Sequence, residues 1–265
     1  MSVKLVKLFK GVSIASPWPA VFLEKEDALL VADLHLGLED EYESKGIHIP
    51  KSPLAKVVSY ITSPIKELGC SKVFILGDVK HEFGKPKEAE WFGVKRLFKA
   101  VKALGCEVEV IRGNHDNYII SILKAVGIKL HQPSIKAEDF LLLHGHDFPI
   151  ALDKDVRCII MGHEHPSIVI KDELGVRHRY KAFLSGVFDH RRVLVLPSVS
   201  PLAIGSDVNE LPCHELLSPI LQKAELNEFT PYLIEVGVDV KRFPKVGELA
   251  LGGGAGPDGE VWAEI

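Results

Sequence analysis

Acid and histidine residues recur in five short clusters between residues 33 and 165. The clusters are Asp33-Leu34-His35, Gly77-Asp78, Gly113-Asn114-His115-Asp116, His144-Gly145-His146 and Gly162-His163-Glu164-His165. Seven of the 12 histidines lie in these clusters or, as His81 does, close beside one. Carboxylate oxygens mixed with imidazole nitrogens suit manganese, iron or zinc better than magnesium or calcium. So many ligands favour two metal ions over one, and metal pairs serve phosphoryl chemistry by stabilising both the attacking and the leaving oxygen.

Each cluster directly follows a short apolar run. The runs lie at residues 28–32, 72–76, 107–111, 140–143 and 158–161. Short apolar runs bounded by polar residues are typical of buried strands in α/β proteins. Ligands of such sheets gather at the carboxyl ends of the strands. We therefore expect the five clusters to converge on one edge of the molecule.

Helical patterns separate the first three of these strands. Ser52-Pro53 is a suitable helix start, and this helix should end at Gly69, with Pro64 interrupting or restarting it. A second helix is predicted over residues 87–104 and a third from about residue 117 to 125, ending at Gly127. Alternation of strands and helices predicts parallel pairing with right-handed crossovers.

The remaining segments follow other patterns. Residues 1–26 predict a strand and a turn, and residues 168–198 alternate apolar and polar side chains, as antiparallel strands of a second sheet do. Residues 210–229 are polar and irregular. A strand is predicted over 232–238, followed by turns at 252–254 and 257–259 around a final hairpin. Because there is no internal repeat and no long linker, we expect one domain over residues 1–265.

Basic residues gather in the predicted second sheet. They are Arg177, His178, Arg179, Lys181, Arg191 and Arg192. A solvated strand face is the preferred explanation, and contact with a nucleic-acid backbone is the alternative.

Composition narrows the class of protein. The net charge of −4 argues against a general nucleic-acid coating protein, which is usually basic, but allows a local basic patch. No apolar stretch reaches the roughly 18 to 20 residues of a membrane span, so no membrane partner is expected. The four cysteines lie far apart, without the paired spacing of structural zinc sites. These features favour an enzyme of a reducing compartment, the cytoplasm by default.

The five clusters, in this order and each after a strand, resemble the five motifs of the calcineurin-like metallophosphoesterases. The resemblance covers residues 33–165, about half the chain. Within that superfamily, residues 77–84 and 201–209 are similar to the Icc-like phosphoesterases of archaea and bacteria. Some members of that group are associated with a DNA-repair ligase and act as DNA phosphodiesterases or endonucleases. The resemblance implies an α/β fold, a four-layer α/β/β/α sandwich with two mixed sheets.

The resemblance also implies a set of metal ligands. Asp33, His35 and His165 would hold one divalent ion, while Asn114, His144 and His163 would hold the other. Asp78 would bridge the two ions, and a water shared between them would be ionised. Manganese is the first expectation for both ions, with iron, zinc and nickel as alternatives. His144 is preferred to His146 as the ligand, and His146 could instead support the site from behind.

Other residues of the motifs are candidates for catalysis and substrate binding. The resemblance gives His115, beside the ligand Asn114, the role of stabilising or protonating the leaving group, oriented by Asp116; a purely structural histidine is the alternative. Many superfamily members carry an acid or Asn where this chain has His81, which follows Lys80. Both could contact a substrate phosphate, or His81 could support the loop while Lys80 faces solvent. The acidic stretch 39–41 is interpreted as a solvated helix start.

These expectations combine into one function. We expect a metal-dependent phosphoesterase, a phosphodiesterase before a monoesterase, with a DNA endonuclease or exonuclease of repair as the sharper form. A phosphomonoesterase or protein phosphatase is one alternative. A scaffold that kept the fold and lost catalysis is another, although a scaffold has no reason to keep every ligand position.

Overall fold

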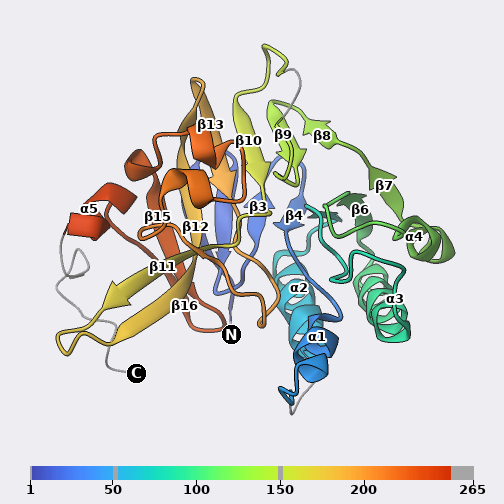
Figure 1. Cartoon of the computed structure of the whole chain (residues 1–265). Coiled ribbons are helices and arrows are strands. Elements are labelled where there is room, and N and C mark those ends of the chain that lie inside the picture. The colour runs from blue at the N-terminus through green and yellow to red at the C-terminus, as the bar shows by residue number, and fades with distance from the viewer. Residues whose placement is uncertain (1, 50–52, 149–151, 252–265) are drawn as a thin grey trace.

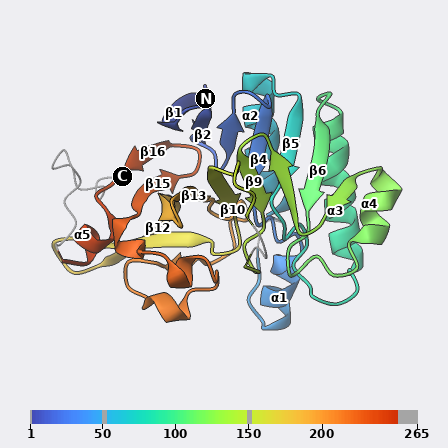
Figure 2. The ribbon, with the colours of Figure 1, turned by 90° about the horizontal axis from the view of Figure 1, so that it is seen from above.

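Two β-sheets packed face to face form the centre of the protein. The computed structural model describes residues 2–49, 53–148 and 152–251. Helices cover the outer face of the first sheet, and the second sheet lies on the opposite side, as Figures 1 and 2 show. In the described part of the chain, no helix is both long and apolar enough to pass through a membrane.

The first sheet holds seven strands in the order of the sequence. They are β1 (Lys4–Phe9), β2 (Val12–Ser16), β3 (Val21–Leu23), β4 (Ala28–Val31), β5 (Lys72–Ile75), β6 (Glu107–Ile111) and β7 (Lys129–His131). Neighbours from β1 to β4 pair antiparallel and those from β4 to β7 parallel, so the sheet is mixed. Residues 1–26 therefore contribute three strands where the sequence pattern predicts one.

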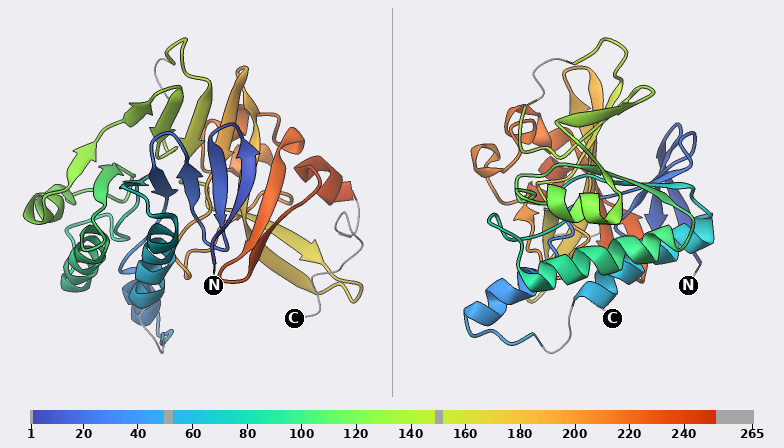
Figure 3. Two further views of the ribbon diagram at one scale, coloured as in Figure 1. Left: turned by 180° about the vertical axis from the view of Figure 1, so that it is seen from behind. Right: turned by 90° about the vertical axis from the view of Figure 1, so that its right-hand side faces the viewer.

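Helices follow the parallel strands as predicted. They are α1 (Leu38–Ser44), α2 (Leu54–Leu68), α3 (Glu88–Lys102) and α4 (Ile120–Val126). Figure 3 shows α2 and α3 lying side by side. Gly69 and Gly127 end α2 and α4 in the left-handed conformation. The predicted break at Pro64 is wrong, because this residue is buried inside a continuous α2, whose apolar face packs on the sheet despite the lost backbone hydrogen bond.

The second sheet holds nine strands. They are β8 (Ser134–Ala137), β9 (Phe140–Leu143), β10 (Cys158–Met161), β11 (Pro166–Lys171), β12 (Arg177–Phe188), β13 (Arg191–Val195), β14 (Ser206–Asp207), β15 (Thr230–Glu235) and β16 (Asp239–Arg242). Strands β9, β10 and β13 are parallel neighbours, whereas β11, β12, β15 and β16 pair antiparallel. The last two of the five cluster-bearing strands thus belong to a different sheet from the first three.

Three hydrophobic layers fill the space between these elements. One lies between α2–α4 and the first sheet, one between the two sheets, and one outside the second sheet. The last is covered by the 3₁₀ turns η1 (Cys213–Glu215), η2 (Leu221–Lys223) and η3 (Leu226–Glu228) together with α5 (Val246–Leu251). The four-layer α/β/β/α sandwich is confirmed, with a thin fourth layer. Ser52 and the turns predicted at 252–259 lie outside the described residues.

Candidate metal centre

The loops after β4, β5, β6, β9 and β10 meet at one end of the sandwich. Backbone N–H of His163, after β10, donates to Asp33 Oδ2, after β4, at 2.9 Å. The ring Nδ1 of His144, after β9, donates to the carbonyl of Leu76, after β5, at 2.7 Å. The structure therefore brings all five sequence clusters together across the junction of the two sheets.

A first group of potential ligands consists of Asp33, His35 and His165, whose donor atoms lie within 4.8 Å of one another. The Nε2 atoms of His35 and His165 are 3.1 Å apart, and His165 Nε2 is 3.4 Å from Asp33 Oδ1. Asp33 and His35 are buried. The donor atoms of Asp33, His35 and His165 lie close together, an arrangement that a cation would stabilise.

A second group consists of Asp78, His144 and His163, again with donor atoms within 4.8 Å. His144 Nε2 lies 3.3 Å from Asp78 Oδ2 and 3.0 Å from Asn114 Oδ1. Because His144 Nδ1 donates to a carbonyl, its Nε2 is the nitrogen available to a metal.

Asp78 lies between the two groups. The same oxygen, Oδ2, is 3.3 Å from His144 Nε2 and 3.8 Å from His35 Nε2. A bridging carboxylate must face both ligand sets in this way. The other oxygen, Oδ1, accepts the backbone N–H of His115 at 2.9 Å, which holds the carboxylate in place.

Asp33 shows most directly that the site suits a cation. Its Oδ1 is buried and, among the described residues, has no hydrogen-bond partner. A carboxylate oxygen left without a partner in the interior costs free energy, so each such atom calls for an explanation. The surrounding oxygen and nitrogen donors fit a borderline divalent ion such as manganese, iron or zinc.

The backbone at the site adopts uncommon conformations. Five potential ligands have positive φ: Asp33, His35, Asp78, His163 and His165. Non-glycine residues pay a cost for this conformation, and such outliers cluster at functional sites. Glycines make the close approach possible, since a Cβ on Gly113 would lie 2.1 Å from Asp78 Oδ1.

Burial and charge set the protonation of these groups. Burial lowers the pKa of His35 and of His163 to about 3, so both rings are neutral and able to bind metal. Burial also acts to lower the pKa of His144, but the carboxylates of Asp78 and Asp33 outweigh it and raise that pKa to about 9. A cation replacing this proton would release it to solvent, because ligands bind metals in the deprotonated form.

His115 lies beside both ligand groups but uses its ring differently. Its Nδ1 donates to the backbone carbonyl of His81, which leaves Nε2 unprotonated, 4.0 Å from Asp78 Oδ2. Phe83 packs against the ring, with centroids 3.8 Å apart. The expectation that Asp116 orients His115 is wrong, since the carboxylate of Asp116 accepts the backbone N–H groups of Gly113 and Val79 instead. Asp116 thus joins the loops after β5 and β6.

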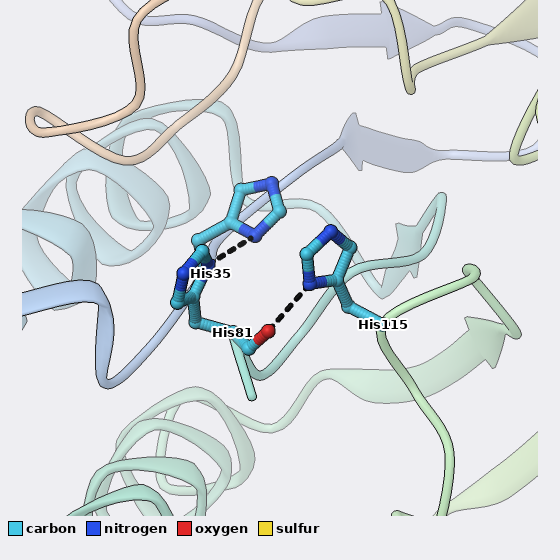
Figure 4. A group of neighbouring side chains, drawn as sticks. All are labelled: His35, His81 and His115. Carbon is cyan, nitrogen blue, oxygen red and sulfur yellow. Dashed lines mark hydrogen bonds between the residues drawn. The ribbon is translucent and has the colours of Figure 1, made fainter. Parts of the chain in front are cut away.

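Lys80 and His81 have different surroundings. Lys80 is fully buried, and its ammonium donates to the carbonyls of Glu82, of Gly84 at 3.3 Å and of His115 at 2.8 Å. This placement favours a role in shaping the loop over contact with substrate. His81 lies next to His35 and His115, as Figure 4 shows, and both of its ring nitrogens have protein partners.

The structure also bears on two alternatives that the sequence leaves open. His144 belongs to the second ligand group and His146 to none of the groups, although their ring centroids are 5.2 Å apart, so His144 stays the preferred ligand. On the basic strand β12, Arg177 pairs with Glu210 and Arg179 with Asp207. These ion pairs favour the solvated strand face over nucleic-acid contact.

Three residues near the site appear in the sequence patterns only as members of larger groups, without a role at the site. Glu41, at the end of the acidic stretch, reaches His81. Glu164 is buried between two ligand histidines and accepts the backbone N–H of Ser218 at 2.8 Å. Lys181 donates to the carbonyls of Ser198, at 2.7 Å, and Ser200. An acid or lysine close in sequence to a motif is a weak signal, so only the fold identifies these contacts.

Comparison with known proteins shows the fold. No protein-family model matches the chain, and no curated protein matches it. The crystal structure of Pseudomonas putida nuclease MPE is similar, with 20% sequence identity and a TM-score of 0.62, over 91% of this chain and 100% of that one. A phosphoesterase from E. coli, Yfce, is 14% identical over 84% of this chain and 94% of that one, with a TM-score of 0.39, too low to indicate a shared fold. The first likeness agrees with the metallophosphoesterase-type sandwich predicted from the sequence.

Proposed function

We propose that the chain is a dinuclear metal-dependent phosphoesterase of the calcineurin-like superfamily, acting on phosphodiesters. One observation carries the proposal: Asp78 Oδ2 faces the histidines of both ligand groups, and the first group includes the buried Asp33 Oδ1, which has no hydrogen-bond partner among the described residues. In the proposed assignment Asp33, His35 and His165 hold one cation and Asn114, His144 and His163 the other. When bound, two divalent cations, manganese in the first instance, supply Lewis acidity that activates water and neutralises a phosphate.

The protein's own groups prepare this centre in three ways. The five loops fix the ligands on strand ends, and the buried rings of His35 and His163 stay neutral. Burial of Asp33 and Asp78 keeps bulk water from competing for the cations. We assign His115 the handling of the leaving group, because its Nε2 faces the site; the ring would first take up a proton from solvent at Nε2 and then donate it to the leaving oxygen.

The preferred substrate class is a phosphodiester. The more specific proposal is that the protein is a DNA endonuclease or exonuclease that acts in repair. The resemblance to Icc-like phosphoesterases supports it, and the structure with the same fold is named a nuclease. A charged diester, bound at the sandwich end near His115 and Phe83, would present its leaving oxygen to His115.

The test compares substrates at matched metal concentration. Metal-stripped protein with added Mn²⁺ is assayed on bis-p-nitrophenyl phosphate, p-nitrophenyl phosphate, a cyclic nucleotide, a phosphopeptide, and single- and double-stranded DNA. We expect turnover of the diesters to exceed that of the monoesters and to cease on chelation. Preference for monoesters or the phosphopeptide would favour the phosphatase alternative. Metal binding without turnover of any of these would favour the scaffold.

A further inference from the structure

Glu41 and His81 form a chain of contacts that ends on a candidate metal ligand. His81 Nε2 lies 2.5 Å from Glu41 Oε2, and His81 Nδ1 lies 3.3 Å from His35 Nδ1. His35 presents its other nitrogen, Nε2, to His165 and Asp78. Figure 4 shows the His81 and His35 rings meeting through their Nδ1 atoms.

These contacts determine where the protons sit. A carboxylate only accepts hydrogen bonds, so His81 Nε2 carries a proton and donates it to Glu41. With this single proton on its ring, His81 has a bare Nδ1 that accepts from His35. His35 therefore carries its proton on Nδ1, and its Nε2 keeps a free lone pair on the side of Asp33 and His165.

We propose that Glu41 and His81 are positioning residues that fix the tautomer and ring orientation of His35 for metal binding. The inference rests on the proposed function insofar as His35 is taken as a metal ligand. Partners of this kind orient ligand histidines and raise their basicity. Residue 81 acts twice, because its backbone carbonyl also accepts from His115 Nδ1 and so orients the leaving-group residue.

This role differs from contact between His81 and a substrate phosphate. A phosphate requires a free N–H, whereas both ring nitrogens of His81 already have protein partners. Glu41 lies on α1 and its side chain is 44% exposed, so replacing it disturbs no core packing. It also pairs with Lys45 one helical turn further on, which provides a matched control.

The experiment measures Mn²⁺ affinity of the metal-stripped protein by titration calorimetry. We expect Glu41→Ala to weaken one of the two binding events about tenfold and His81→Phe to weaken it about 10- to 100-fold. Glu41→Gln should bind more tightly than Glu41→Ala, because the amide oxygen can still accept from His81. His81→Gln should bind more tightly than His81→Phe, because its amide can accept from His35 while donating to Glu41. Lys45→Met should stay within about twofold of the wild type, since it leaves the Glu41–His81 contact in place.

Nitrogen NMR shifts of the metal-stripped protein give a readout independent of metal. We expect His81 protonated on Nε2 and His35 on Nδ1, with His35 losing this preference in Glu41→Ala.

The outcomes separate this inference from the proposed function. Unchanged Mn²⁺ affinity in Glu41→Ala and His81→Phe would overturn it, and a fall in diester turnover alone would then identify His81 as a substrate contact. A wild-type protein that binds Mn²⁺ with the expected variant pattern but hydrolyses no phosphoester would keep the positioning role and end the proposed function. If His81→Phe fails to fold, the exposed Glu41 variants decide.

Discussion

The two sheets contribute different halves of the candidate metal centre. The first sheet supplies all of the carboxylates and the amide, Asp33, Asp78 and Asn114, together with His35; the second supplies only imidazoles, from His144, His163 and His165. Each of these two ligand groups draws on both sheets, whereas a third group of donor atoms, from His35, His81 and His115, lies on the first sheet alone. Binding of cations and packing of the two sheets should therefore depend on each other, although the sheets are held together by a hydrophobic layer of their own.

The largest expected effect comes from Asp78, whose Oδ2 faces histidines of both groups. Asp78→Ala removes the shared oxygen, and the loss of several kcal/mol of charge stabilisation should lower kcat/KM for a diester by about 10³-fold or more. Metal content by mass spectrometry should fall from two ions toward one. His163→Ala, from the other sheet, is the matched variant. If only one of the two variants lost activity, the centre would belong to a single sheet.

Removal of metal should loosen the junction of the sheets. A ligand present at about 100 times its dissociation constant stabilises the folded state by about 2.7 kcal/mol. For a protein of this size that corresponds to about 5–10 °C in Tm. Thermal unfolding with Mn²⁺ and with chelator measures it, and Asp78→Ala should reduce the difference. Equal Tm values in both conditions would show that the cations do not join the sheets.

Lys181 tests a further connection between the sheets, through pH. It lies on β12 and holds the loop at Ser198, whose hydroxyl donates to the Asp33 carbonyl at 2.6 Å. Burial lowers the pKa of Lys181 to about 7, although the nearby carboxylate of Asp33 acts to raise that pKa. Between pH 7 and about 10.5 the unfolded chain binds a proton that the folded protein does not, so stability should rise with pH.

We expect the metal-stripped protein to gain on the order of 1–3 kcal/mol between pH 7 and 9 from this group. Lys181→Met should lack that gain in urea denaturation measured across the same range. Parallel pH curves for the two proteins would mean that Lys181 stays charged in the folded state.

The smallest effect concerns packing at the junction itself. A Cβ on Gly162 would lie 2.6 Å from the Ala32 Cβ and 2.6 Å from Asp33 Oδ2, between the ends of β10 and β4. Gly162→Ala should cost about 1–3 kcal/mol of stability by overpacking and should weaken Mn²⁺ binding. Gly84→Ala should be nearly neutral in urea denaturation, because the atoms nearest to a Cβ there would lie 3.7 Å or more away. A neutral Gly162→Ala would show that the sheets separate easily here.

Local patterns predicted much of the elements and of the site. The apolar runs at 28–32, 72–76 and 107–111 form β4, β5 and β6, and Gly69 and Gly127 end their helices. Pro64 shows the limit, because burial of a helix face outweighs one missing hydrogen bond. The partner of the His115 ring also had no local signal, since Asp116 is adjacent in sequence but the carbonyl of His81 is adjacent in space.

The sequence by itself determined which residues end the strands and what chemistry they offer, because strand periodicity and ligand types are local properties. Tertiary structure alone decided that β9 and β10 face β4 and β5 across two sheets, so that His144 and His163 meet Asp78 and Asp33. It also decided that Glu41 reaches His35 through His81. Contacts between residues far apart in the chain depend on packing of whole layers, which no short pattern specifies.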